Sequence, residues 1–201
     1  MFSGKNKIGI AGLGLIGGSI ARALKKSGKD YVIFADDRGA ETLKQASDLG
    51  IVDQCVVSVK DGFSACDIVF LCLPVHLMGD TLKELIPGLS PQCILTDVGS
   101  AKGQVISLVK DMALDHRFIG GHPLAGSEKS GFSASKANLF ENAYYCMTPT
   151  DRTPQIAKDC LKSLIKDMGA IPLEITPEEH DRATAVISHI PHIVAALLVN
   201  L

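Results

Sequence analysis

The chain alternates short apolar runs, rich in valine, isoleucine and leucine, with amphipathic stretches of helical period. Continuous apolar runs are typical of parallel strands buried on both faces, and the periodic stretches between them predict covering helices. The predicted strands are residues 7–14 (running into a turn), 31–36, 55–59, 67–74, 93–99, 117–121, 144–149 and 171–176. The predicted helices are residues 15–27, 40–49, 76–86, 101–114 and 154–168. The pattern therefore predicts an α/β fold built on a doubly wound, mostly parallel sheet.

The pattern changes near residue 175. Residues 176–179 (TPEE) form a capping box with proline at the first helical position, and no strand is predicted beyond them. Residues 193–201 are apolar nearly all round, which is typical of a helix buried against other protein, and they are too short to span a membrane. We expect residues 1–175 to form one domain and residues 176–201 to be the first helix of an all-helical domain that is otherwise missing from the chain.

Three glycines form a G-x-G-x-x-G motif directly after the first predicted strand: Gly12, Gly14 and Gly17. In this context the motif predicts a Rossmann-type dinucleotide site, with the pyrophosphate at a helix N-terminus. Asp36 ends the second strand, 19 residues after Gly17, where a carboxylate binds the ribose hydroxyls and repels a 2′-phosphate. NAD is therefore favoured, although Arg38 could receive the phosphate of NADP. The alternative is a glycine-rich turn without a ligand.

Composition and charge narrow the class of protein. The chain has 201 residues, 46% of them hydrophobic, and a formal net charge of −2. This charge is too close to zero for the positive field of a nucleic-acid binder, and no segment predicts a membrane partner. The six cysteines include no C-x-x-C pair and lie mostly in apolar runs. We expect buried free thiols in a cytoplasmic protein rather than zinc ligands or disulfides.

Residues 121–131 (GHPLAGSEKSG) place a histidine in an unusual backbone setting. Pro123 restricts His122 to extended backbone, while the glycines around it leave room for ligands. His122 follows one predicted strand and Ser100 another, and the carboxyl ends of parallel strands meet at the edge where open α/β sheets bind ligands. We therefore expect both side chains to face one pocket. The alternative is a histidine with only a structural role.

Two further histidines, His189 and His192, are three residues apart in the sequence SHIPH and would share a helix face. Pro191 between them would interrupt the helix by clashing with the carbonyl of Ile187. The pair fits a functional site or a satisfied polar cluster at a helix bend. A metal site is disfavoured, because no acidic or thiol ligand has suitable spacing nearby. The remaining histidines are predicted to be solvated and without function: His76, His116 and His180.

Four motifs together resemble the prephenate dehydrogenase family, of which arogenate dehydrogenases are close relatives. They are GLGLIGGSIARAL, DVGSAKG, GGHPLAGSEKSG and EEHDRATAVISHIPH. The resemblance runs from residue 7 to the end of the chain, and the last two motifs are the most specific. It implies NAD-dependent oxidative decarboxylation of prephenate to 4-hydroxyphenylpyruvate in tyrosine biosynthesis.

The same resemblance implies roles for single residues. His122 would take the proton of the substrate hydroxyl, and Ser100 would hold that hydroxyl and orient the nicotinamide. The residues expected to line the substrate pocket are Ser127, Glu128, Ser188, His189 and His192. The residues expected to bind the cofactor are Gly12, Gly14, Leu15, Ile16, Gly17, Asp36, Arg38, Leu73, Pro74 and Ser100.

The family also has a longer helical domain, which forms a homodimer and carries an arginine for the substrate carboxylate. We expect that arginine beyond Leu201. Three alternatives stay open from the sequence: an arogenate dehydrogenase, another dehydrogenase such as one for β-hydroxy acids, or a non-catalytic dinucleotide-binding module. The β-hydroxy acid enzymes use a lysine on their helical part, and no lysine follows Lys166 here.

Overall fold

The computed structural model describes residues 6–199, without the side chains of residues 60, 61, 189 and 192–194. In this part of the chain, eight strands form one sheet in the order β3-β2-β1-β4-β5-β6-β7-β8. Only the β6–β7 pair is antiparallel. The strands are β1 (Asn6–Ala11), β2 (Tyr31–Asp36), β3 (Gln54–Cys55), β4 (Ile68–Leu71), β5 (Ile94–Asp97), β6 (Phe118–Pro123), β7 (Tyr144–Thr148) and β8 (Ile171–Glu174). The predicted α/β fold with a mostly parallel sheet is confirmed.

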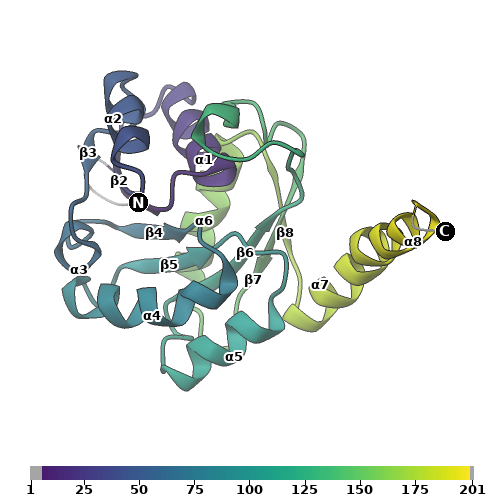
Figure 1. Ribbon diagram of the computed structural model, residues 1–201. Helices are drawn as coiled ribbons and strands as arrows, with labels where there is room; N and C mark the ends of the chain where they lie inside the picture. The colour runs from purple at the N-terminus through teal and green to yellow at the C-terminus, as the bar shows by residue number, and fades with distance from the viewer. Residues whose placement is uncertain (1–5, 200–201) are drawn as a thin grey trace.

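Helices cover both faces of the sheet (Figure 1). They are α1 (Leu15–Lys26), α2 (Ala40–Asp48), α3 (Val59–Gly62), α4 (Val75–Leu85), α5 (Gly103–Asp111) and α6 (Gln155–Asp167), with short turns η1 (Ile86–Gly88) and η2 (Phe132–Ala134). Side chains of successive strand residues alternate between two apolar cores, as the period of two requires. In β4, Ile68 and Phe70 pack in the core of α1 and α6, while Val69 and Leu71 pack in the core of α4 and α5.

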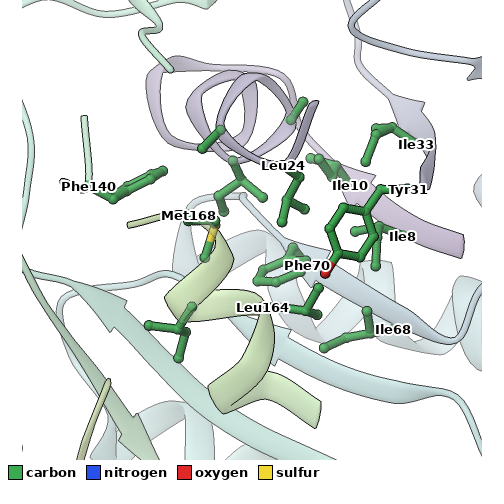
Figure 2. Packing of buried hydrophobic residues seen from close by; sticks show 14 of the residues in the cluster. Ile8, Ile10, Leu24, Tyr31, Ile33, Ile68, Phe70, Phe140, Leu164 and Met168 are labelled. Carbon is green, nitrogen blue, oxygen red and sulfur yellow. The ribbon is translucent and has the colours of Figure 1, made fainter. Parts of the chain in front are cut away.

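The first of these cores lies between α1, α6 and the strands at the centre of the sheet. Figure 2 shows Leu24 of α1 and Leu164 of α6 packed around Ile10 and Phe70. All four side chains are at most 4% exposed. Since burial of such a side chain contributes about 1.5–3 kcal/mol, this core fixes the helix that follows the glycine motif on the sheet.

One predicted strand, residues 55–59, is wrong in most of its length. The strand β3 contains only Gln54 and Cys55, which pair with Phe34 and Ala35 at the edge of the sheet. Val57 is fully exposed and Val59 already begins α3. An apolar run with no neighbouring strand on one side and no helix over Val57 has no partner that would hold it extended.

The chain ends in a helical rod that leaves the sheet domain: α7 (Pro177–Thr184), the π-helical turn η3 (Ala185–His189) and α8 (Ile190–Val199) (Figure 1). The predicted capping box is confirmed, because Thr176 Oγ1 accepts the Glu179 N–H and Glu179 Oε2 accepts the Thr176 N–H. The π-helical turn ends at His189, two residues before Pro191, where the sequence predicts an interruption. Within residues 6–199, no helix is long and apolar enough to cross a membrane.

Candidate active site

The glycine turn joins β1 to α1 and exposes bare backbone. Gly12 has a φ of +98°, in the left-handed region that favours glycine. A Cβ on Gly17 would lie 2.0 Å from the Gly12 carbonyl oxygen, so only glycine lets the helix approach the turn. A Cβ on Gly14, in contrast, would meet nothing within 4 Å. Gly14 thus presents an open backbone surface at the start of α1, whose first turn has no side-chain cap.

Two neighbouring aspartates at the end of β2 lie beside this turn and make different contacts. Asp37 Oδ2 accepts the Leu13 N–H at 2.8 Å and therefore fixes the turn itself, a role the motif did not predict. Asp36 is the last residue of β2, as predicted, and is partly exposed. Burial and the adjacent Asp37 raise the pKa of Asp36 above its ordinary value. Arg38 is exposed close by.

The other predicted cofactor residues surround the same turn. Leu15 and Ile16 open α1, while Leu73 and Pro74 lie between β4 and α4. The Leu73 side chain approaches within 3.1 Å of the point where a Cβ on Gly12 would stand. Strand order reverses between β1 and β4, and ligands of open α/β sheets bind at such a switch point.

At the next strands, one buried carboxylate holds the loop that carries Ser100 and the strand end that carries His122. Asp97, the last residue of β5, accepts the Gly99 N–H at 2.9 Å and the Gly121 N–H at 3.0 Å. These donors immediately precede Ser100 and His122. Asp97 therefore sets the relative position of both backbone segments.

The partner of this carboxylate is a buried lysine from the DVGSAKG motif. Lys102 and Asp97 have fully buried side chains and form an ion pair. Lys102 Nζ also donates to the Gly121 carbonyl oxygen at 2.7 Å. Burial lowers the pKa of Lys102, and Asp97 opposes that change. No role was predicted for this pair, although a charged residue at each end of DVGSAK is a signal for it.

His122 lies at the end of β6 and contacts a second histidine. The distance from His122 Nδ1 to His180 Nε2 is 2.8 Å, and the rings meet edge to face at 71°. His180 Nδ1 is in turn 2.8 Å from Asp181 Oδ1. The prediction that His180 is solvated is wrong: its residue is 1% exposed. Its position in the first turns of α7 suggested exposure to solvent. In the structure, however, α7 packs against α5 and β7, and His180 is buried.

A cleft of about 360 Å³ lies between the end of β6 and the C-terminal rod. It is lined by His122, Pro123, Leu124, Ala125, Gly126, Thr184, Ile187 and Ser188. His122 and Ser188, predicted from distant motifs, thus meet in one cleft. A larger cavity of about 420 Å³ opens between the amino-terminal half of β1 and α6. That cavity is at the opposite edge from the glycine turn and His122, so we place the candidate site at the smaller cleft.

The remaining predicted site residues differ in how they relate to the cleft. Ser100 is exposed in the loop after β5. Ser127 and Glu128 are exposed in the loop that continues from the cleft, where Ser127 Oγ donates to Glu128 Oε2 at 3.3 Å. The side chains of His189 and His192 lie outside the described part of the structure.

That loop is anchored on the helix that follows the glycine turn. Arg22 Nε of α1 donates to Ser135 Oγ at 2.8 Å, and the Arg22 guanidinium lies over the Phe132 ring at 4.7 Å. The Lys136 N–H donates to Ser19 Oγ at 3.0 Å. The loop after His122 and the dinucleotide motif therefore share one rigid support.

Comparisons with known proteins agree with this arrangement. Residues 20–173 match the family model of the prephenate dehydrogenase nucleotide-binding domain, and residues 176–201 match that of the prephenate dehydrogenase dimerization domain. Prephenate dehydrogenase of Bacillus subtilis is 45% identical over 199 residues, which are 98% of this chain and 53% of that protein. The chain spans about half the length of these curated relatives.

Solved structures of prephenate and arogenate dehydrogenases also superimpose closely on this chain. Prephenate dehydrogenase from A. aeolicus, in complex with hydroxyphenyl propionate and NAD⁺, superimposes with a TM-score of 0.91 at 37% identity, covering 100% of this chain and 70% of that one. Synechocystis arogenate dehydrogenase superimposes with a TM-score of 0.88 at 38% identity, covering 96% and 68%. With the fold, the glycine turn and the histidine cleft in place, the match over most of its length shows that this chain belongs to the prephenate dehydrogenase family.

Proposed function

We propose that this chain carries the catalytic half of an NAD-dependent prephenate dehydrogenase, which converts prephenate to 4-hydroxyphenylpyruvate and carbon dioxide. The observation that carries the proposal is the position of His122. Its ring lines a cleft at the carboxyl edge of the sheet, on the same edge as the glycine turn. Family membership supports this reaction over other chemistry on the same fold.

NAD is the cofactor that the residues present fit best. The open backbone at Gly14 and the uncapped start of α1 suit a pyrophosphate, which a side chain at Gly14 would obstruct. The Asp36 carboxylate suits the hydroxyls of an unphosphorylated ribose and disfavours a 2′-phosphate. The A. aeolicus relative was solved with NAD⁺, which supports the same choice here.

The proposed chemistry uses one proton transfer to the protein. Bound NAD⁺ would supply the acceptor for the hydride that leaves the ring carbon carrying the substrate hydroxyl. His122 takes the hydroxyl proton as the carbonyl forms, a contribution of about 10²–10⁴-fold in rate. Ser100 holds the same hydroxyl oxygen by a hydrogen bond. The bond to the ring carboxylate then breaks, its electron pair makes the ring aromatic, carbon dioxide leaves, and the phenolate oxygen takes back a proton.

The other predicted side chains complete the substrate pocket in this proposal. Ser127 and Glu128 line it from the loop after β6, and Glu128 gates it. Ser188, His189 and His192 reach it from the C-terminal rod. The contact of Ser188 with the cleft supports this set.

Arogenate is a second candidate substrate, favoured by the similarity to Synechocystis arogenate dehydrogenase. Arogenate differs from prephenate only in the side chain that carries the amine, away from the carbon that loses hydride. His122 and Ser100 would therefore serve both substrates alike. The discrimination must come from residues that contact the side chain.

The assembly proposed is a homodimer formed through the helical segment, with the domain boundary near residue 175. The exposed large hydrophobic residues of the rod support it: Val186, Ile187, Ile190, Leu197, Leu198 and Val199. Sedimentation velocity is expected to show a dimer, and a monomer at micromolar concentration would contradict this part of the proposal.

A cytoplasmic location is supported by the six cysteines, all of them free.

The function is tested by following NADH formation from prephenate and from arogenate. Two proteins are used: this chain, and this chain joined after Leu201 to the remaining residues of the Bacillus subtilis relative. We expect NADH and 4-hydroxyphenylpyruvate from prephenate in the joined protein. A protein that binds NAD⁺ by calorimetry but forms no NADH with either substrate would be a dinucleotide-binding module instead. Faster turnover of arogenate would make it an arogenate dehydrogenase.

A further inference from the structure

A hydrogen-bonded series runs from His122 into the sheet domain through α7. His122 Nδ1 and His180 Nε2 are 2.8 Å apart, and His180 Nδ1 and Asp181 Oδ1 are also 2.8 Å apart. His180 is buried, so water does not compete for these contacts. His122 itself belongs to β6, whereas His180 and Asp181 belong to the first two turns of the helical segment.

The far end of the series accepts hydrogen bonds on both carboxylate oxygens. Asp181 Oδ1 accepts the Lys102 N–H at 2.8 Å, and Oδ2 accepts the Gly103 N–H at 2.8 Å. These donors open α5, so Asp181 lies at the positive end of a helix dipole. Burial raises the pKa of Asp181, but the hydrogen bonds from Gly103, Lys102 and His180 lower it by more, and the net change is downward. The ionised carboxylate has no hydrogen to donate.

This fixes the direction of every hydrogen bond in the series. Because Asp181 only accepts, His180 Nδ1 carries the hydrogen between them. In neutral His180 the other nitrogen, Nε2, is then an acceptor. It accepts from His122 Nδ1 at 2.8 Å, and the Thr184 hydroxyl, 3.5 Å away, is placed to donate to it as well.

We propose that His180 and Asp181 are positioning residues that hold the ring hydrogen of His122 on Nδ1, so that Nε2 is the basic nitrogen of this ring. Which nitrogen of a histidine is basic is set by the hydrogen bond made by the other. The consequence for turnover rests on the proposed function, in which His122 accepts the substrate proton. The tautomer itself is a property of this chain and can be measured without substrate.

A consequence of the proposal is that the base is competent only when the helical segment is docked. The orienting residues are contributed by α7, and α7 is attached to α5 by the same Asp181 that orients His180. A displacement of α7 from α5 removes the acceptor for His122 Nδ1–H. The two tautomers of His122 then mix.

The direct test is a long-range proton–nitrogen spectrum of the ¹⁵N-labelled chain at about pH 8, above the ordinary imidazole pKa of ~6.5. This spectrum reports which ring nitrogen of each histidine carries hydrogen. We expect His122 and His180 to carry it on Nδ1. A His122 ring with its hydrogen on Nε2, or a His180 ring with hydrogen on both nitrogens, would overturn the proposal.

Variants separate this role from simple support of the helix. His180→Leu removes the acceptor and should reduce the Nδ1–H form of His122 to about half or less, whereas His180→Gln keeps an acceptor oxygen and should restore it. Glu179→Ala breaks the capping box of the same helix without touching the series, and it should leave the tautomer unchanged. Equal effects of His180→Leu and Glu179→Ala would show that the series is only structural.

Turnover gives the second readout, in the joined protein. Asp181→Asn puts an amide hydrogen where an acceptor is needed, and we expect kcat for prephenate to fall by about 10²-fold or more with KM changed little, as for a wrong tautomer of a catalytic histidine in other enzymes. A rise in KM with kcat unchanged would contradict the proposal. An inactive parent protein with the expected tautomer would refute the proposed function and leave the positioning role intact.

Discussion

The glycine turn and the histidine cleft lie on one edge of the same sheet but are stabilised in different ways. The turn is defined by backbone geometry: Gly12 needs a positive φ, and Gly17 has no room for a Cβ. The strand end that carries His122 into the cleft is held by charged side chains, since the buried Asp97–Lys102 ion pair binds the backbone of Gly121. We therefore expect an added Cβ to disturb the turn, and the loss of a buried charged side chain to disturb the cleft.

The largest effect is expected from removing the buried charge that holds this strand end. Asp97→Ala leaves the Lys102 ammonium buried and deprives two backbone N–H groups of their acceptor. We expect the free energy of unfolding to fall by about 3–5 kcal/mol, measured by urea denaturation. Asp80→Ala, which breaks the exposed pair with Lys83, is the control and should cost less than about 1 kcal/mol. Similar losses for both variants would contradict the account of the cleft.

The next effect separates folding from ligand binding within the glycine turn. Gly17→Ala places a Cβ against backbone and should destabilise the fold by about 1–3 kcal/mol. Gly14→Ala places its Cβ in open space, so stability should not change. Its NAD⁺ affinity by calorimetry should nevertheless fall about tenfold, or ~1.4 kcal/mol. Unchanged affinity of Gly14→Ala would mean that no phosphate approaches this backbone.

Cofactor choice provides a third test of the turn. Asp36→Ala should weaken NAD⁺ binding by about tenfold, because the ribose hydroxyls lose their acceptor, and should narrow the preference over NADP⁺. Adding Arg38→Ala tests whether this exposed cation then receives the 2′-phosphate. Both affinities can be measured by fluorescence or calorimetric titration. An Asp36→Ala protein with parental NAD⁺ affinity would remove Asp36 from the site.

The smallest expected effect is the loss at low pH of the contact that Asp181 makes between α7 and the start of α5. The pKa of Asp181 is lowered in the folded chain, so its contribution to docking is present above the ordinary aspartate pKa of about 3.9 and is lost as pH falls through the lower folded value. The amide signals of Lys102 and Gly103 should stay in place down to about pH 4 and shift only below it. A shift already near pH 6 would assign the change to a histidine instead.

The same contrast explains what the sequence could predict. The glycine turn, the position of Asp36 and the capping box depend on residues near one another in the chain, and all three were predicted with correct positions. The mostly parallel sheet was predicted from the alternation of strands and helices, whereas its strand order is seen only in the structure. His122 and Ser188 were assigned through motifs, and the structure brings both to one cleft.

The residues that sequence reasoning missed act through contacts between distant segments. His180 was predicted to be solvated because its own helix gives no reason for burial, and its partner His122 is 58 positions away. Asp97 and Lys102 are close in sequence, but their importance depends on Gly121 of another strand. Asp37 was overlooked because the dinucleotide motif specifies only one acid after β2. Local patterns cannot show which polar groups become buried together.

The central claim, that His122 is the base beside the bound dinucleotide, is tested most directly by one comparison of rates. NADH formation from prephenate is measured for the joined protein and for its His122→Asn variant, with NAD⁺ affinity measured on the same samples. We predict a fall of at least about 10²-fold in kcat with NAD⁺ affinity nearly unchanged. A variant that forms NADH as fast as its parent would contradict the claim.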